Sequence, residues 1–173
     1  MLEESGETDL SLRGVARRAG VSPAAPYRHY QDREALVSAV AAVGYRELAE
    51  RLAAAHPSPS TPEELAAVAT AYVQFALERP ALFRIMFSEP CDRDSDDRVA
   101  ATEAISLYLR GIVERVFAQA DPEALATAIW ALVHGLAFLY LDGKLDAPSP
   151  AAVAERVTAA TEAVIAATGR GSR

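Results

Sequence analysis

The stretch SLRGVARRAGVSPAAPYRHYQDREALVSAV, residues 11–40, decides the fold of this chain. Ser11 is a helix-capping residue, and the apolar residues that follow it at helical spacing predict a helix that ends at about Ala19. Gly20 comes next, and glycine readily adopts the left-handed conformation that ends a helix. The first part of the stretch therefore predicts a short helix followed by a tight turn.

The second part, GVSPAAPYRHY at residues 20–30, predicts another helix. Ser22 can cap it, and the proline that follows suits a first helical turn because its missing N–H needs no partner there. This helix is expected to end near Tyr30, and Asp32 then caps a third helix over residues 33–55. Two helices joined by a tight glycine turn form a helix-turn-helix arrangement.

Charge is concentrated in the same stretch. The 173-residue chain has a net charge of −7, whereas residues 11–33 contain five arginines and one aspartate, a net charge of +4. Repulsion from phosphate groups argues against a protein that coats nucleic acid with its whole surface. One short cationic segment on an acidic body instead indicates a protein that presents a single surface to DNA.

The second predicted helix carries side chains that suit the major groove of duplex DNA. Ala24 and Ala25 are small enough to allow close approach to base edges and can contact thymine methyl groups. Arg28 is the candidate for a guanine contact. The side chains of Tyr27, His29 and Arg33 can donate to phosphate oxygens. The predicted DNA-binding residues are Ser22, Ala24, Ala25, Tyr27, Arg28, His29 and Arg33. The alternative is a solvated helical hairpin with incidental arginines.

The rest of the chain also reads as helical, which makes the expected fold class all-α. The Pro/Ser-rich break HPSPSTPEE separates the third helix from later ones, which are expected over residues 62–78, 80–88, 96–119, 122–141 and 150–167. We expect a DNA-binding domain over residues 1–44 and a helical-bundle domain for ligand binding and dimerisation over residues 45–173.

Eighteen consecutive residues, 124–141, carry no formal charge. This length is at the lower limit for a membrane-spanning helix. The segment has no cluster of Lys and Arg at either end and is interrupted by Thr127 and His134, so we expect no membrane span. A single cysteine excludes an internal disulfide and no signal-peptide pattern is evident at the start, so we expect a cytoplasmic protein. A helix that is apolar on every side is then buried on every side, either in a bundle or against a partner subunit.

The two last predicted helices are the expected dimer interface. Together they provide enough apolar area for a four-helix contact between two copies of the chain. The residues expected at this interface are Trp130, Leu132, Leu136, Leu139, Tyr140, Val153, Val157, Val164 and Ile165. An obligate homodimer is the prediction.

Aromatic and sulfur-containing side chains of the second half could line a pocket for a small molecule. They are equally typical of an ordinary helical core. The role of His134 is undecided in the same way, because its side chain could form a hydrogen bond with a ligand, with a backbone carbonyl or with a facing subunit. The candidate ligand-binding residues are Tyr72, Phe75, Phe83, Met86, Phe87, Tyr108, Trp130, His134 and Phe138.

The sequence gives little support for catalysis. Cys91, the single cysteine, has acidic neighbours that raise rather than lower a thiol pKa, and the three histidines are far apart in sequence. No glycine-rich phosphate loop, HExxH motif or paired-cysteine zinc spacing occurs. The acidic residues at 92–97 lack the glycine and terminal glutamate of a calcium loop. We therefore expect no enzyme, no metal and no cofactor.

Residues 11–40 resemble the DNA-binding module of tetracycline-repressor-type (TetR-family) regulators, through the VA pair, the GV turn, the YRHY segment and the capped helix after it. The segments FALERPALFRIMFS and WALVHGL are similar to the regulatory domain of one subgroup of that family. The resemblance implies a helix-turn-helix headpiece on an all-helical sensing domain, acting as a homodimer that represses transcription until an effector binds. It also implies that Tyr27 and His29 contact phosphates and that the two alanines face the bases.

Two further expectations follow from this resemblance. The effector is expected to be small and apolar or amphipathic, and the partner to be double-stranded operator DNA. Family members have a full helix before the residue at Leu10, whereas only MLEESGETD precedes it here. The alternative function is therefore a small-molecule-binding or enzymatic helical bundle with a vestigial headpiece.

Overall fold

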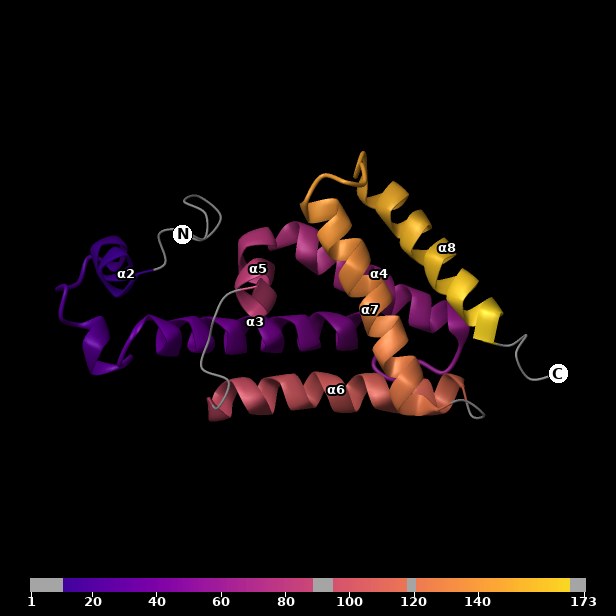
Figure 1. Cartoon of the computed structure of the whole chain (residues 1–173), viewed down its shortest axis with the longest axis horizontal. Helices are drawn as coiled ribbons and strands as arrows, with labels where there is room; N and C mark the ends of the chain where they lie inside the picture. Colours follow the sequence, from indigo (N-terminus) through magenta and orange to yellow (C-terminus); the bar gives the residue numbers. More distant parts are fainter. Residues whose placement is uncertain (1–10, 89–94, 118–120, 169–173) are drawn as a thin grey trace. The chain divides into compact units, whose positions relative to one another are not determined.

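The computed structural model describes residues 11–88, 95–117 and 121–168, and it confirms the all-α fold class (Figure 1). The described residues contain no strand. Their elements are α2 (Leu12–Ala19), the short 3-10 helix η2 (Pro26–Arg28), α3 (Arg33–Ala55), α4 (Pro62–Glu78), α5 (Pro80–Ser88), α6 (Asp96–Val116), α7 (Pro122–Leu141) and α8 (Pro150–Thr168).

Local signals set most helix ends. Ser11 accepts a hydrogen bond from the Gly14 amide at 3.0 Å, and Gly20 ends α2 in the left-handed conformation with φ 67°. Asp32 caps α3 through the Ala35 amide at 2.8 Å. The predicted boundaries of α3, α4, α5 and α7 are confirmed, α8 extends one residue further than predicted, and α6 ends at Val116 rather than near residue 119.

The predicted helix over residues 22–30 is wrong. Only the single turn η2 forms there, preceded by a separate turn in which the Ala25 amide donates to the Ser22 carbonyl at 2.9 Å. Pro26 has no N–H, so it cannot donate the helical hydrogen bond to the same carbonyl. The segment is therefore two short turns, with the Pro26 ring buried and the Pro26 carbonyl accepting from His29 and Tyr30.

The chain divides into two compact units. We call them the headpiece unit, residues 1–47 and 79–104, and the body unit, residues 48–78 and 105–173. The headpiece unit thus takes α5 and the start of α6 as well as the N-terminal helices. The predicted domain division between residues 44 and 45 stays a prediction.

Close packing joins α3 to α5 in the headpiece unit. A side chain at Gly44 would place its Cβ 2.6 Å from the Met86 Sδ, so glycine allows the two helices to approach there. One residue later, the Tyr45 hydroxyl donates to the Met86 carbonyl at 2.8 Å. At the end of the same contact, Arg79 pairs with Glu47 at 3.1 Å.

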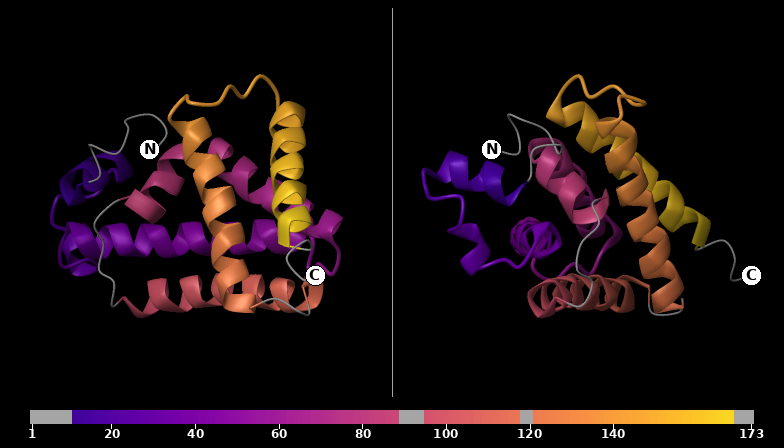
Figure 2. Two further views of the ribbon diagram at one scale, coloured as in Figure 1. Left: turned by 45° about the vertical axis from the view of Figure 1, so that its right-hand side comes forward. Right: turned by 60° about the vertical axis from the view of Figure 1, so that its left-hand side comes forward.

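The body unit is built around α4, which packs against both α7 and α8 (Figure 2). The loop over residues 142–149 joins α7 to α8. Thr61 and Glu64 cap the start of α4 reciprocally, because the Thr61 Oγ1 accepts from the Glu64 amide and the Glu64 carboxylate accepts from the Thr61 amide. The Ser60 amide, together with the Ser60 hydroxyl and the Thr61 amide, donates to the Glu64 carboxylate and lowers the pKa of Glu64.

Helix α7 is long and apolar enough to cross a membrane, judged by length and composition alone. A core helix of a water-soluble protein meets the same criterion. Only 28% of its most apolar window is buried within one chain. Of the two predicted alternatives, burial at the centre of a single-chain bundle is therefore wrong, and burial against a partner subunit stays a prediction, because an apolar face is left exposed.

Candidate functional site

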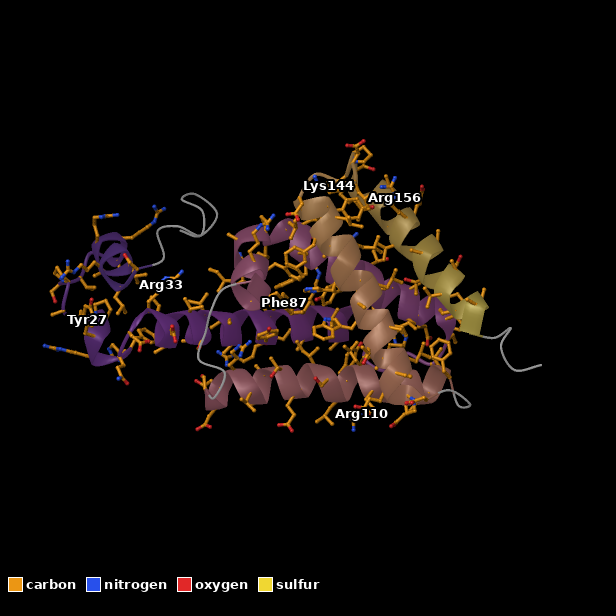
Figure 3. The ribbon with its side chains drawn as sticks, in the orientation of Figure 1. Tyr27, Arg33, Phe87, Arg110, Lys144 and Arg156 are labelled. Atoms are coloured by element: carbon orange, nitrogen blue, oxygen red, sulfur yellow. The ribbon has the colours of Figure 1, made fainter. Side chains whose placement is uncertain are left out.

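The turns between α2 and α3 present most of the predicted DNA-binding side chains to solvent. Six of the seven are exposed, and Ala25 is half-buried. Tyr27 is 51% exposed although it is a large aromatic residue. Figure 3 shows Tyr27 on η2 and Arg33 at the first residue of α3. Buried Pro26 anchors the segment, so the exposed side chains belong to a fixed edge of the headpiece unit.

Helix α2 adds cations that the predicted set of contacts did not include. Arg13, Arg17 and Arg18 are all exposed, whereas Leu12 and Ala16 on its other face are buried. Arg17 and Arg18 lie in the last turn, where positive charge is favourable beside the helix C-terminus. The amphipathic arginine pattern was visible in the sequence, so the signal for these residues was present.

Three predicted ligand-binding residues lie on α5 in the headpiece unit. Phe83 and Met86 are fully buried, and Phe87 is half-buried. The Phe87 ring contacts Tyr45 edge-on at 5.4 Å between centroids and Phe83 at 4.7 Å. These contacts fit a role as core residues that hold α5 against α3.

Four more form an aromatic cluster in the body unit. The Tyr72 hydroxyl and the His134 Nδ1 are hydrogen-bonded at 3.0 Å between α4 and α7. The His134 ring lies between Trp130 and Phe138 on α7, with centroid distances of 5.8 and 4.9 Å. Burial lowers the pKa of His134. We call Tyr72, Trp130, His134 and Phe138 the aromatic cluster.

The two remaining candidates, Phe75 and Tyr108, make contacts within the protein that support the fold. Phe75 is 2% exposed, in the core of the body unit. The Tyr108 hydroxyl donates to the backbone carbonyls of Leu52 and His56 at the end of α3, and burial raises the pKa of Tyr108. This hydroxyl therefore satisfies the His56 carbonyl just beyond the end of α3, while the Leu52 carbonyl also accepts from the His56 amide.

A hollow of about 390 Å³ lies in the body unit between the end of α4 and the start of α8. We call it the α4/α8 hollow. Its lining residues are Gln74, Leu77, Glu78, Ala147, Ser149, Pro150 and Val153. None of the nine predicted ligand-binding residues lines it. No sequence motif marked these residues, because they come from two segments that are distant in sequence, 74–78 and 147–153.

The exposed face of α7 changes the expected dimer interface. Leu136, Tyr140, Val153 and Val157 are buried within the single chain, so their prediction as interface residues is wrong. Trp130 and Leu139, by contrast, are 45% and 43% exposed. Gly135 is exposed on the same helix, and a Cβ added there would meet no atom within 4 Å. A broad apolar face, which we call the apolar strip, is thus available to a partner, with Trp130 and Leu139 at its opposite edges and Gly135 between them.

Among the described residues, no group of three or more His, Cys, Asp or Glu side chains could hold a metal ion. Cys91 and the acidic residues at 92–94 lie outside the described residues.

Two family descriptions match the chain. "Bacterial regulatory proteins, tetR family" matches residues 1–40, and "Tetracyclin repressor-like, C-terminal domain" matches residues 65–164. The N-terminal match covers the cationic stretch, and the C-terminal match covers the aromatic cluster and the α4/α8 hollow.

Known proteins show the same similarity. A solved structure of a protein of unknown function from Rhodococcus sp. RHA1 is 36% identical, with a TM-score of 0.76 over 94% of this chain and 86% of that one. The HTH-type transcriptional regulator BetI of Brucella canis is 27% identical over 85% of this chain and 76% of its own length. The uncharacterized HTH-type transcriptional regulator YobS of Bacillus subtilis is 22% identical over 79% and 71%.

Proposed function

Because the chain belongs to the TetR family of DNA-binding transcriptional regulators, which are not enzymes, we propose that it represses transcription and leaves its operator when a small effector binds. The observation that carries the proposal is the exposed, cationic edge formed by η2 and its neighbouring turns. We place its action in the cytoplasm, where its operator DNA is found.

The proposed contacts divide by chemistry. Arg28 is exposed and can donate two hydrogen bonds to a guanine edge, while the small side chain of Ala24 admits a thymine methyl group. Tyr27, His29 and Arg33, together with Ser22, position the edge on phosphate oxygens. The exposed arginines of α2 add phosphate contacts of the kind that the first helix of such a motif makes.

Direct binding measurements test this assignment. Palindromic DNA flanking the coding region is the operator candidate, and fluorescence anisotropy measures its affinity at several salt concentrations. We expect Arg28→Ala to cost about 1–3 kcal/mol and to relax specificity at one base position, because the lost contact reads a base. Tyr27→Phe should weaken binding to all sequences.

The matched control is Arg110→Ala, which removes an exposed arginine from the body unit (Figure 3). It should leave both the affinity and the salt dependence unchanged. If the native protein shows no salt-dependent DNA binding, the repressor proposal fails and a vestigial headpiece becomes the better account.

A dimer is part of the proposal. One short DNA-binding segment gives few base contacts. A two-fold dimer places two such segments, one from each subunit, in successive major grooves about 34 Å apart. The exposed apolar strip of α7, with Trp130, Leu139 and Gly135, is the proposed core of the interface. Half-buried Leu132, Val164 and Ile165 remain at its border.

For the effector, we propose contact with the aromatic cluster. His134 and Tyr72 offer a polar pair within an otherwise aromatic surface, which suits an apolar or amphipathic molecule. Such a ligand can shift the regulator between DNA-bound and free forms only by its different affinities for the two. The test is to titrate a cell-extract fraction that releases the native protein from operator DNA into the native protein and into His134→Gln. Equal binding to both proteins would place the effector elsewhere.

A further inference from the structure

We propose that the α4/α8 hollow is a second ligand site, which takes a small molecule that joins an apolar body to a positively charged ammonium group. The proposal goes beyond the regulatory function above, because it needs neither DNA binding nor the aromatic cluster. It rests on the size, the lining and the charge of the hollow.

The volume and the walls suit a small organic molecule. About 390 Å³ lies within the range of 300–1,000 Å³ that is typical of ligand pockets. Leu77, Ala147, Pro150 and Val153 provide apolar walls, and Val153 is buried. A molecule with one aromatic ring or a short alkyl chain would cover this surface and remove it from water.

The polar groups of the lining favour a hydrogen-bond donor. Glu78 accepts from Arg51 through Oε1 at 2.7 Å, and its other carboxylate oxygen has no partner among the described residues. The amide of Gln74, one helical turn earlier on the same face of α4, has no hydrogen bond in this part of the chain either. The Ser149 hydroxyl already accepts from the Ala152 amide. The Ser149 hydroxyl keeps a second lone pair, and on the α4 side the free carboxylate oxygen of Glu78 is the charged acceptor.

Charge decides between an ammonium group and other donors. Glu78 is the one charged residue in the lining; Arg51 neutralises it through Oε1, and its other carboxylate oxygen is the position where an ammonium group can be held. The competing pair with Arg51 is exposed, with 41% and 53% of the two side chains accessible. Exposed ion pairs contribute little, so Arg51 does not exclude a second cation from the free oxygen.

Isothermal titration calorimetry on the full chain tests the proposal with three probes of one shape: 4-phenylbutylammonium, 4-phenylbutanol and 4-phenylbutyrate. We expect the ammonium probe to bind, the alcohol to bind a few-fold more weakly, and the carboxylate to bind more weakly still, because only the first forms an ion pair with the partly exposed Glu78 carboxylate. Equal binding of all three would show apolar adsorption and overturn the proposal, as would no binding at all.

Variants locate the site. Glu78→Gln should weaken ammonium binding a few-fold, because the lost ion pair is partly exposed, and its control Glu63→Gln removes an exposed charge from the other end of α4 without effect. Arg51→Gln should strengthen binding a few-fold, since it frees the carboxylate. If the Arg51–Glu78 pair had a purely structural role, Glu78→Gln and Arg51→Gln would change the affinity for the ammonium probe in the same direction. That result would count against the site.

A steric pair completes the test. Ala147→Phe fills the hollow from an exposed position and should abolish binding, whereas Pro148→Phe adds the same ring at the neighbouring exposed residue outside the lining and should not. Unchanged binding to Ala147→Phe overturns the proposal. Because none of these measurements uses DNA, their outcome is independent of whether the operator experiments succeed.

Discussion

His134 shows how one side chain connects burial, hydrogen bonding and pH. It is half-buried between Trp130 and Phe138 and bonded to Tyr72 across α4 and α7. Burial disfavours the charged imidazolium, which lowers the pKa of His134 below that of the unfolded chain, about 6.5. The neutral ring therefore stabilises the fold above pH 6.5, and this contribution is lost as the pH falls through the lowered pKa.

We predict that the free energy of unfolding falls more between pH 7.5 and pH 5 in the native protein than in His134→Gln. Glutamine keeps a hydrogen-bonding group near Tyr72 but cannot take up a proton in this range. Urea titrations at both pH values give the free energy of unfolding of each protein, and the loss between pH 7.5 and pH 5 is then compared between the two. The prediction is contradicted if the two proteins lose equal stability on acidification, since the neutral histidine would then contribute nothing.

Single residues also mark where sequence reasoning succeeds. Ser11 and Asp32 act as predicted because such a cap depends on a side chain and a backbone amide three positions away, and Gly20 acts as predicted because, without a Cβ, it readily adopts the left-handed conformation. The roles of Phe83 and Met86 could not be predicted in the same way. An aromatic or sulfur-containing side chain looks the same in a sequence whether it meets a ligand or, as in the core of α5, its own protein.

At the scale of elements, the clearest success is the set of helices that begin with proline. α4, α5, α7 and α8 all have proline at their first residue, where the missing N–H has no cost. The clearest failure is the helix predicted between α2 and α3, because Pro26 lies where an interior amide was needed. One residue type thus gave both outcomes, and its position within the element decided which.

The contact between α3 and α5 supports a prediction about packing. Gly44→Leu should destabilise the protein by about 1–3 kcal/mol, because a Cβ at this position would overlap the buried Met86 side chain. Thermal or urea unfolding measures the loss. Ala54→Leu, an exposed position on the same helix, is the control and should change stability by less than about 0.5 kcal/mol. Equal stability of both variants would contradict the close approach at Gly44.

For the whole molecule, the exposed strip of α7 could be only half predicted. An eighteen-residue uncharged run shows that the helix must be covered on all sides, but it does not show which side its own chain covers. Long-range packing against α4 and α8 makes that choice: it buries Leu136 and Tyr140 and leaves Trp130 and Leu139 outside. The α4/α8 hollow was beyond prediction for the same reason, since its walls come from distant segments.

The assembly can be tested at the centre of that strip. Gly135 has open space around it within one chain, so Gly135→Arg should leave the monomer folded but place a charge where a partner helix must approach. We predict a dimer for the native protein at micromolar concentration and a monomer for the variant, measured by sedimentation velocity. Trp130, the single tryptophan, should shift its emission to longer wavelength as it becomes exposed. Ala54→Arg adds the same charge to an exposed position on α3 and should remain dimeric. A dimeric Gly135→Arg would place the interface on another surface, and a monomeric native protein would remove the two-fold arrangement on which the proposed operator contacts depend.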